Sequence, residues 1–252
     1  MFSGKWKVWM GILGLVLAGT GAWVWGLKYF AARPAFVEDR THRVWLPVGY
    51  TVFGIDISQY QRSIDWEKLS QERIAGQPIR FVFIKATEGI SRQDPLFAKH
   101  WTQAHAAGFI CGAYHFFYAT RNPLLQARNF EQTVNLMPGD LPPVLDAEVD
   151  NHQPDSVIRQ TIRIYLNELT RYYGVKPIIY TNLHFYRKYI RGYLDEYPIW
   201  IAQHNLRSLP QDAADWLFWQ ISDEARIRGI TGFTDLNVFR DDFDKLRALC
   251  LP

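Results

Sequence analysis

The chain has 252 residues, of which 28 are basic and 25 acidic, and its formal net charge is +3. This length allows one large domain with a buried core plus an appendage. Four of the basic residues precede Glu38, and the remainder holds 24 basic and 25 acidic residues, which excludes a basic surface for nucleic acid. Cys111 and Cys250 fit no metal-ligand spacing, and we expect two separate buried thiols, with one disulfide as the alternative.

The first 30 residues contain an uncharged apolar run from Val8 to Leu27. A helix of this length, rising about 1.5 Å per residue, would span a bilayer. Lys5 and Lys7 precede the run, as in a helix whose N-terminus stays in the cytoplasm. We therefore expect residues 1–30 to be a single membrane anchor, with the rest of the chain in the periplasm or on the cell-wall side. The alternative is a cleaved signal peptide, although the apolar run continues past the small residues around Ala22.

Residues 31–49 contain two prolines and mixed charges without a clear period, and they predict a linker. From residue 50 to residue 252, short apolar runs alternate with helical patterns. The predicted strands are 52–57, 81–85, 109–117, 143–146, 177–181, 199–202, 217–221 and 235–238. The predicted helices are 65–72, 95–107, 123–136, 154–173, 183–191 and 242–249.

Continuous apolar strands that alternate with helices indicate a parallel sheet covered by helices. About eight such strands favour a closed barrel. The predicted fold class is therefore α/β, an irregular TIM-like β/α barrel of about eight mostly parallel strands over residues 50–252. The helices between the last strands are short or missing in the pattern, so the irregularity is expected there.

In a β/α barrel the reactive groups lie at the carboxyl ends of the strands. The polar residues that end the predicted strands are Asp56, Ser58, Lys85, Glu88, His115, Asp146, Glu148, Tyr180, Gln203, Gln220, Asp235 and Asn237. Four strands thus bring carboxylates to one rim, an arrangement typical of an active site. We expect His115, which lies in an apolar run, to be a hydrogen-bonded core residue.

Asp146 and Glu148 stand two positions apart on one predicted strand, so both should face the barrel mouth. Two close carboxylates cannot both ionise freely, and one pKa rises. A carboxylic acid that keeps its proton near neutral pH can protonate a glycosidic oxygen. We expect the outer Glu148 to be that acid and the inner Asp146 to hold the charge, with hydrogen bonds from Tyr180 and the strand end. The alternative is that the pair caps a helix or forms salt bridges.

Several motifs in a fixed order resemble glycoside hydrolase family 25, the Chalaropsis-type lysozymes. They are GIDIS at 54–58, FIKATEG at 83–89, GAYHF at 112–116, LPPVLDAE at 141–148, IYTN at 179–182, WIA at 200–202, WQ at 219–220 and DLN at 235–237. The resemblance runs from about Phe53 to Phe239. It implies an irregular β/α barrel and a muramidase that cuts the β-1,4 bond between N-acetylmuramic acid and N-acetylglucosamine in peptidoglycan. It implies no metal and no organic cofactor.

Carried over to this sequence, the resemblance implies that Glu148 is the general acid and that Asp146, Asp56 and Asp235 are further catalytic carboxylates. With the other rim and aromatic positions, the predicted substrate-binding residues are Tyr180, Tyr114, Phe116, Trp200, Gln220, Lys85, Glu88 and Asn237. The reaction could use the substrate's own acetamido group, oriented by Asp146, or direct attack by a carboxylate or by activated water.

Four residues depart from the pattern of this family. Arg62 and Ser63 stand where a glycine is usual, and His204 and Ile221 occupy places where aromatic residues are expected. Two other functions remain open on the same barrel, namely a non-catalytic glycan-binding protein and an enzyme for another amino-sugar polymer such as chitin. Loss of a rim carboxylate would favour the binding protein, and none is lost.

Overall fold

The computed structural model describes residues 36–204, 213 and 215–252. The predicted anchor, residues 1–30, lies outside these ranges. None of the helices within them combines the length and the apolar character that crossing a bilayer requires.

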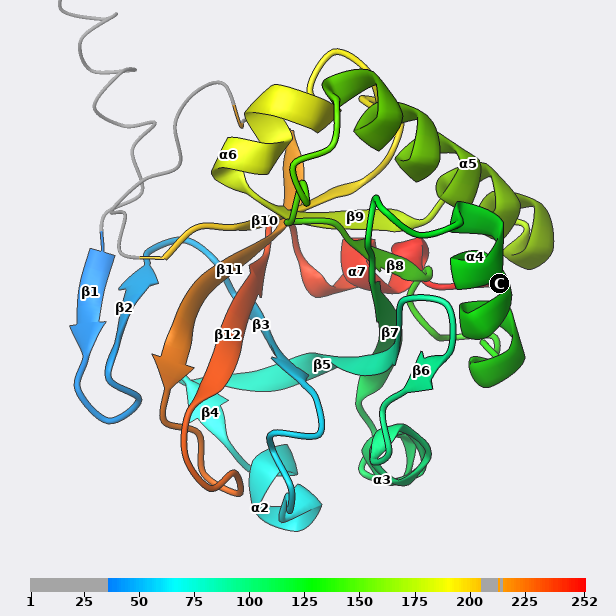
Figure 1. The fold of residues 1–252 in the computed structure, drawn as a ribbon. Coiled ribbons are helices and arrows are strands. Elements are labelled where there is room, and N and C mark those ends of the chain that lie inside the picture. Colours follow the sequence, from blue (N-terminus) through cyan, green and yellow to red (C-terminus); the bar gives the residue numbers. More distant parts are fainter. Residues whose placement is uncertain (1–35, 205–212, 214) are drawn as a thin grey trace, which may run out of the picture.

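Within the described residues, eight strands pair in the order β3-β12-β11-β10-β9-β8-β7-β5, and β3 pairs with β5 to close a barrel (Figure 1). Neighbouring strands are parallel except for β12, which is antiparallel to both β11 and β3. All eight predicted strands are present, which confirms the mixed α/β barrel. Their bounds are Val52–Ile57 (β3), Gln77–Glu88 (β5), Ile110–Phe116 (β7), Val144–Asp146 (β8), Ile178–Asn182 (β9), Ile199–Ala202 (β10), Trp216–Ala225 (β11) and Thr234–Phe239 (β12).

Aromatic side chains fill the interior of the barrel, and two glycines make room for them. A Cβ atom at Gly54 in β3 would lie 2.3 Å from the ring of Phe81, and one at Gly112 in β7 would lie 2.5 Å from the ring of Phe83. The rings of Phe81 and Phe83 meet edge to face, with centroids 5.6 Å apart. The interior is therefore a packed core, and the space for a ligand is confined to one end of the barrel.

Four helices lie outside the barrel in Figure 1: α2 (Trp66–Ser70), α3 (Phe97–Ala106), α4 (Pro123–Thr133) and α5 (Asp155–Tyr173). The buried residues of α5 follow the helical period, for example Ile158, Ile162 and Leu169. This helix ends at Gly174, whose φ of 73° is left-handed. After β9 come only the short α6 (Leu183–Phe185) and a π-helical turn η1 (Tyr186–Ile190), so the barrel is irregular at its last strands, as predicted.

The last helix, α7 (Phe243–Leu249), closes the amino-terminal end of the barrel. Its Leu246 packs with Val52, the first residue of β3, and with Phe239, the last residue of the antiparallel β12. Both thiols are free: Cys111 is buried, and Cys250, directly after α7, is half-buried.

The segment expected to be a linker, residues 31–49, contains a hairpin. Strands β1 (Phe36–Asp39) and β2 (Val44–Pro47) are antiparallel. Val44 and Leu46 are buried against the barrel, and the ring of Phe36 meets that of Trp219 at 5.9 Å. The expectation of a linker is therefore wrong for these residues, because two alternating apolar positions are too few to identify a strand from sequence. Two further short strands, β4 (Arg73–Ile74) and β6 (Arg92–Gln93), pair with β5.

Candidate active site

A pocket of about 220 Å³ opens at the carboxyl ends of the parallel strands. It is lined by Asp56, Ser58, Tyr60, Lys85, Tyr114, Phe116, Asp146, Glu148, Tyr180, Trp200 and Asp235. Nine of the twelve predicted site residues are in this lining. The other three, Glu88, Gln220 and Asn237, lie behind it and bond to residues that line it.

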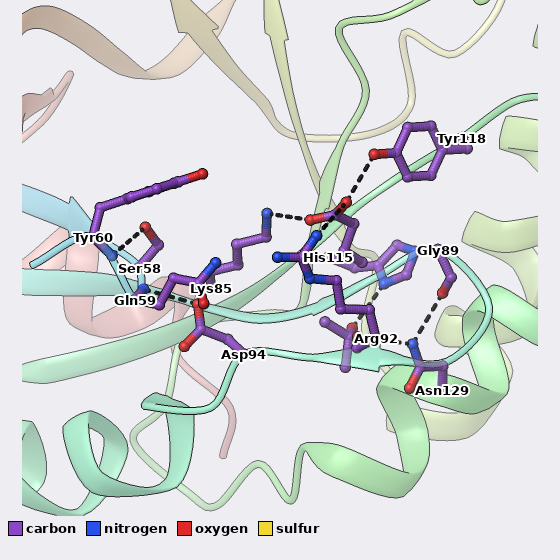
Figure 2. Close-up of polar contacts among 12 residues, drawn as sticks. Ser58, Gln59, Tyr60, Lys85, Gly89, Arg92, Asp94, His115, Tyr118 and Asn129 are labelled. Atoms are coloured by element: carbon purple, nitrogen blue, oxygen red, sulfur yellow. Dashed lines mark hydrogen bonds and ion pairs between the residues drawn. The ribbon is translucent and has the colours of Figure 1, made fainter. Parts of the chain in front are cut away.

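A larger hollow of about 760 Å³ lies elsewhere, in the outer wall beside α3 and the end of α4. Its only ionisable lining group is Asp94, whose two carboxylate oxygens accept hydrogen bonds from the backbone N–H groups of Gln59 and Leu96. Asp94 and Gln59 are drawn in Figure 2. Both oxygens of Asp94 are thus occupied by backbone hydrogen bonds. We therefore place the candidate active site in the smaller pocket at the barrel mouth.

Asp56, in β3, is held by two amide side chains. Its Oδ2 accepts from Gln220 Nε2 at 2.9 Å and from Asn237 Nδ2 at 2.7 Å. The oxygens of these amides are occupied in turn, by Tyr180 OH at 3.1 Å on Gln220 and by Trp200 Nε1 at 2.8 Å on Asn237. Because every partner has its own partner, the orientation of the buried Asp56 carboxyl is fixed.

Asp235 stands directly opposite Asp56, since the two residues are paired in the antiparallel register of β12 and β3. Their side chains share a hydrogen bond. Burial, followed by the negative charge of Asp56, raises the pKa of Asp235 to about 10. Asp235 therefore carries a proton at neutral pH and donates it to the Asp56 carboxylate. Burial also raises the pKa of Asp56, and the bonds from Asp235, Asn237 and Gln220 oppose that rise.

Asp146 is the last residue of β8 and is only 6% exposed, whereas Glu148 follows two positions later and is half-buried. The Oδ1 atom of Asp146 has no hydrogen-bond partner among the described residues. Tyr180, which we expected to bond to Asp146, donates to Gln220 instead, so that expectation is wrong. Tyr180 and Gln220 meet because β9 and β11 both flank β10.

Burial dominates the protonation of this second pair. It raises the pKa of Asp146 well above its ordinary value, and the neighbouring Glu148 raises it further. Burial, followed by the charge of Asp56, also raises the pKa of Glu148. The protein alone therefore does not make Asp146 the charged member, contrary to the sequence-based expectation, and Glu148 has the raised pKa expected of a general acid.

One wall of the pocket carries a positive charge. Lys85 Nζ pairs with a Glu88 carboxylate oxygen at 2.8 Å, and Tyr118 OH donates to the other oxygen at 2.8 Å (Figure 2). The charge of Lys85 lowers the pKa of both Asp146 and Glu148, against the effect of burial. The same ammonium lies 5.0 Å from the centroid of the Phe116 ring. Glu88 thus acts from behind the lining by holding Lys85 in place.

Two predicted aromatic positions differ in their exposure. Trp200 is 1% exposed and stacks on Phe83 at 4.4 Å, so it belongs mainly to the barrel interior. Phe116 is half-buried and lines the pocket. His115 is fully buried and lies 2.7 Å from Thr87 Oγ1, which confirms it as a core residue.

Tyr60 and Tyr118 were missed by the sequence analysis. Tyr60 lines the pocket although it is 79% exposed, and it lies in the loop after β3 (Figure 2). Its only sequence signal is an aromatic residue two positions after Ser58. Tyr118 bonds to Glu88 from the loop after β7, where no periodic pattern exists. Within the described ranges, no group of three or more His, Cys, Asp or Glu side chains is arranged to hold a metal ion.

Comparisons with known proteins agree with this geometry. The sequence model of Glycosyl hydrolases family 25 matches residues 55–230. The uncharacterized protein YegX of Escherichia coli (strain K12) is 36% identical over 222 residues, which cover 88% of this chain and 80% of that protein. Lysozyme M1 of Streptomyces globisporus is 32% identical over 216 residues, which cover 79% of this chain and 71% of that protein.

The fold is shared as well. The structure of a family 25 glycosyl hydrolase from Bacillus anthracis matches with a TM-score of 0.76 and 29% identity, covering 85% of this chain and 100% of that chain. The bacterial lysozyme from Streptomyces coelicolor matches with a TM-score of 0.72 and 29% identity, covering 80% and 98%. The chain therefore belongs to glycosyl hydrolase family 25 and is a glycoside hydrolase of the muramidase type.

Proposed function

We propose that this protein hydrolyses the glycan strands of bacterial peptidoglycan at the β-1,4 bond between N-acetylmuramic acid and N-acetylglucosamine. The observation that carries the proposal is one pocket with two carboxyl pairs, Asp56 with Asp235 and Asp146 with Glu148. Hydrolysis of a glycosidic bond needs a proton donor and a negative charge close to the sugar ring. The two pairs supply both, and the names of the lysozyme relatives support the choice of substrate.

In this proposal Glu148 is the general acid. Its pKa is raised, and it is half-buried at the outer edge of the pocket, where a leaving-group oxygen can approach it. A carboxylic acid that stays protonated near neutral pH can donate to that oxygen as the bond breaks. Lys85 opposes the rise in the Glu148 pKa and so lowers the pH at which Glu148 loses its proton.

Asp146 receives the acetamido group of the substrate. Its Oδ1 atom is buried and makes no bond to the described residues, so it can accept a hydrogen bond from the acetamido N–H. Such a bond favours the charged form of Asp146 and offsets the burial that otherwise keeps it protonated. The acetamido oxygen then attacks the anomeric carbon while Asp146 stabilises the positively polarised group.

Asp56 has a different part, because its orientation is fixed before substrate binds. Two amides and the proton on Asp235 all donate to it. A negative charge held in a fixed position stabilises positive charge that develops on the sugar ring without reorganisation during the reaction. Direct attack by water activated at Asp56 is the competing mechanism on this side of the pocket.

The test uses the full chain in mild detergent with purified cell wall as substrate. We expect clearing in a turbidity assay and, after borohydride reduction of the products, new ends that are reduced muramic acid. Reduced glucosamine ends would contradict the bond assignment. Binding to cell wall without new reducing ends would favour the non-catalytic binding protein, and release of sugars from chitin oligomers alone would favour another amino-sugar polymer.

We also propose that residues 1–30 anchor the enzyme in the membrane, with the catalytic domain in the periplasm or on the cell-wall side. The support is the uncharged run from Val8 to Leu27. The protein should remain in the membrane fraction after salt and carbonate washing, and mass spectrometry should find its N-terminus intact. A mature protein that starts near Ala22 would identify a cleaved signal peptide instead.

A further inference from the structure

His204 extends the hydrogen-bond network of Asp56 toward the surface. It follows β10, and its Nε2 lies 2.8 Å from Gln220 Oε1 while its Nδ1 lies 3.3 Å from Asp223 Oδ1. Its position is fixed through Gln203, whose Nε2 donates to the His204 carbonyl at 3.1 Å and whose own carbonyl accepts from Trp219 Nε1 at 2.9 Å. The ring therefore lies in a defined place between Gln220 and Asp223.

The partners of Gln220 determine where the hydrogens of the His204 ring must be. Gln220 Nε2 donates to the Asp56 carboxylate, so the other end of the amide, Oε1, faces His204 and accepts. His204 Nε2 must then carry a hydrogen. Nδ1 lies 3.3 Å from Asp223 Oδ1, close enough for an ion pair when the ring is charged.

We propose that His204 is a positioning residue of the active site, whose Nε2–H holds Gln220 with the amide nitrogen on Asp56. This inference rests on the proposed function. A ring whose only hydrogen is on Nδ1 presents a lone pair to Gln220 Oε1, and the amide then turns its oxygen toward Asp56. Tyr180 OH is the other donor to the same Oε1 atom and resists that turn.

The charge of His204 acts in the same direction as its hydrogen bond. It lowers the pKa of Asp56 and of Glu148, and so favours a charged Asp56. Among the described residues, the charged and titratable groups around the ring are Asp223 in direct contact, Tyr180 through Gln220, and Asp56 and Glu148 at longer range. The bond and the charge of His204 thus both favour a charged, oriented Asp56.

The experiment compares two variants of the full chain with wild type in detergent, with kcat and KM measured on cell-wall glycan. His204→Phe keeps an aromatic ring without a donor, and kcat should fall by about 5- to 30-fold with KM nearly unchanged, as expected for one lost positioning bond. His204→Gln restores a donor, and its kcat should return to within about threefold of wild type.

A readout independent of activity is the ¹⁵N spectrum of the His204 ring, where we expect Nε2 to carry a hydrogen. A ring whose only hydrogen is on Nδ1 overturns the proposal.

Two kinetic results also overturn it. One is a His204→Phe variant with the kcat of wild type. The other is a His204→Gln variant as slow as His204→Phe at an equal melting temperature, because then the bond to Gln220 has no part in the loss. A wild-type chain that leaves cell wall intact while Nε2 of His204 carries a hydrogen contradicts the proposed function and not the placement of His204.

Discussion

The two carboxyl pairs of the pocket are built in opposite ways. Asp56 and Asp235 come from neighbouring antiparallel strands, and Asp56 receives donors from two amides as well as from Asp235. Asp146 and Glu148 come from the end of one strand, and Asp146 Oδ1 has no partner among the described residues. The protein thus orients one pair with its own hydrogen bonds and leaves an acceptor of the other pair unused among the described residues.

The largest effect should come from the acid itself. Glu148→Gln keeps the shape of the side chain but cannot donate a proton, so kcat on cell wall should fall by about 10²- to 10⁴-fold. The melting temperature should stay close to that of wild type. Glu67→Gln, an exposed change in α2, is the matched control and should clear cell wall normally. Normal clearing by Glu148→Gln would remove this residue from the mechanism.

Asp146→Asn tests whether Asp146 and Glu148 have different roles in the reaction. Removing the charge that stabilises the acetamido group should slow hydrolysis by about 10- to 10³-fold. The loss should persist on an aryl glycoside, whereas Glu148→Gln should be partly rescued there, because a good leaving group needs less protonation. Rescue of Asp146→Asn together with no rescue of Glu148→Gln would reverse the two roles.

Asp235→Asn tests how far the raised pKa of Asp235 lowers the free energy of unfolding at neutral and alkaline pH. The pKa of Asp235 is raised from 3.8 to about 10, so the folded protein binds a proton that the unfolded chain releases. The free energy of unfolding therefore falls as the pH rises from 3.8 toward 10, and the variant, which still donates to Asp56, escapes that fall. At pH 8 it should gain about 1–2 kcal/mol, or roughly 2–8 °C in Tm.

The gain of Asp235→Asn should nearly vanish near pH 3, below the ordinary value of 3.8, where both states of the wild type are largely protonated. The exposed change Asp241→Asn is the control and should show no such pH dependence. An equal shift in Tm at pH 3 and pH 8 would show that ionisation of Asp235 is not the cause.

Lys85→Met should give the smallest effect. Lys85 lowers the pKa of Glu148, so its removal should raise that pKa and move the alkaline limb of the kcat profile upward, by roughly 0.5 pH unit. Lys99→Met, an exposed change in α3, is the control. An alkaline limb that moves to lower pH would mean that Lys85 acts mainly by binding substrate and not by lowering the pKa of Glu148.

The barrel and the membership of its pocket could be predicted from sequence because both depend on local patterns. Apolar runs identified the eight strands, and the residue that ends a parallel run is carried to the rim by the strand itself. Asp235 reaches the same rim from the amino end of β12, because that strand is antiparallel to its neighbours. The hydrogen bonds could not be predicted in this way. Gln220 bonds to Asp56, which lies 164 positions away in the sequence. Tyr180 bonds to Gln220 because their strands, β9 and β11, lie on either side of β10. Tyr60 and Tyr118 come from loops, where no period applies.

The antiparallel entry of β12 has a consequence for biosynthesis. Asn237 and Asp56 are 181 positions apart, and they meet only when β12 closes the barrel against β3. A growing chain that has not yet released β12 from the ribosome has Asp56 without Asn237 and Asp235, so it lacks half of the pocket. The pair of Asp56 and Asp235 therefore forms only after β12 has joined the barrel.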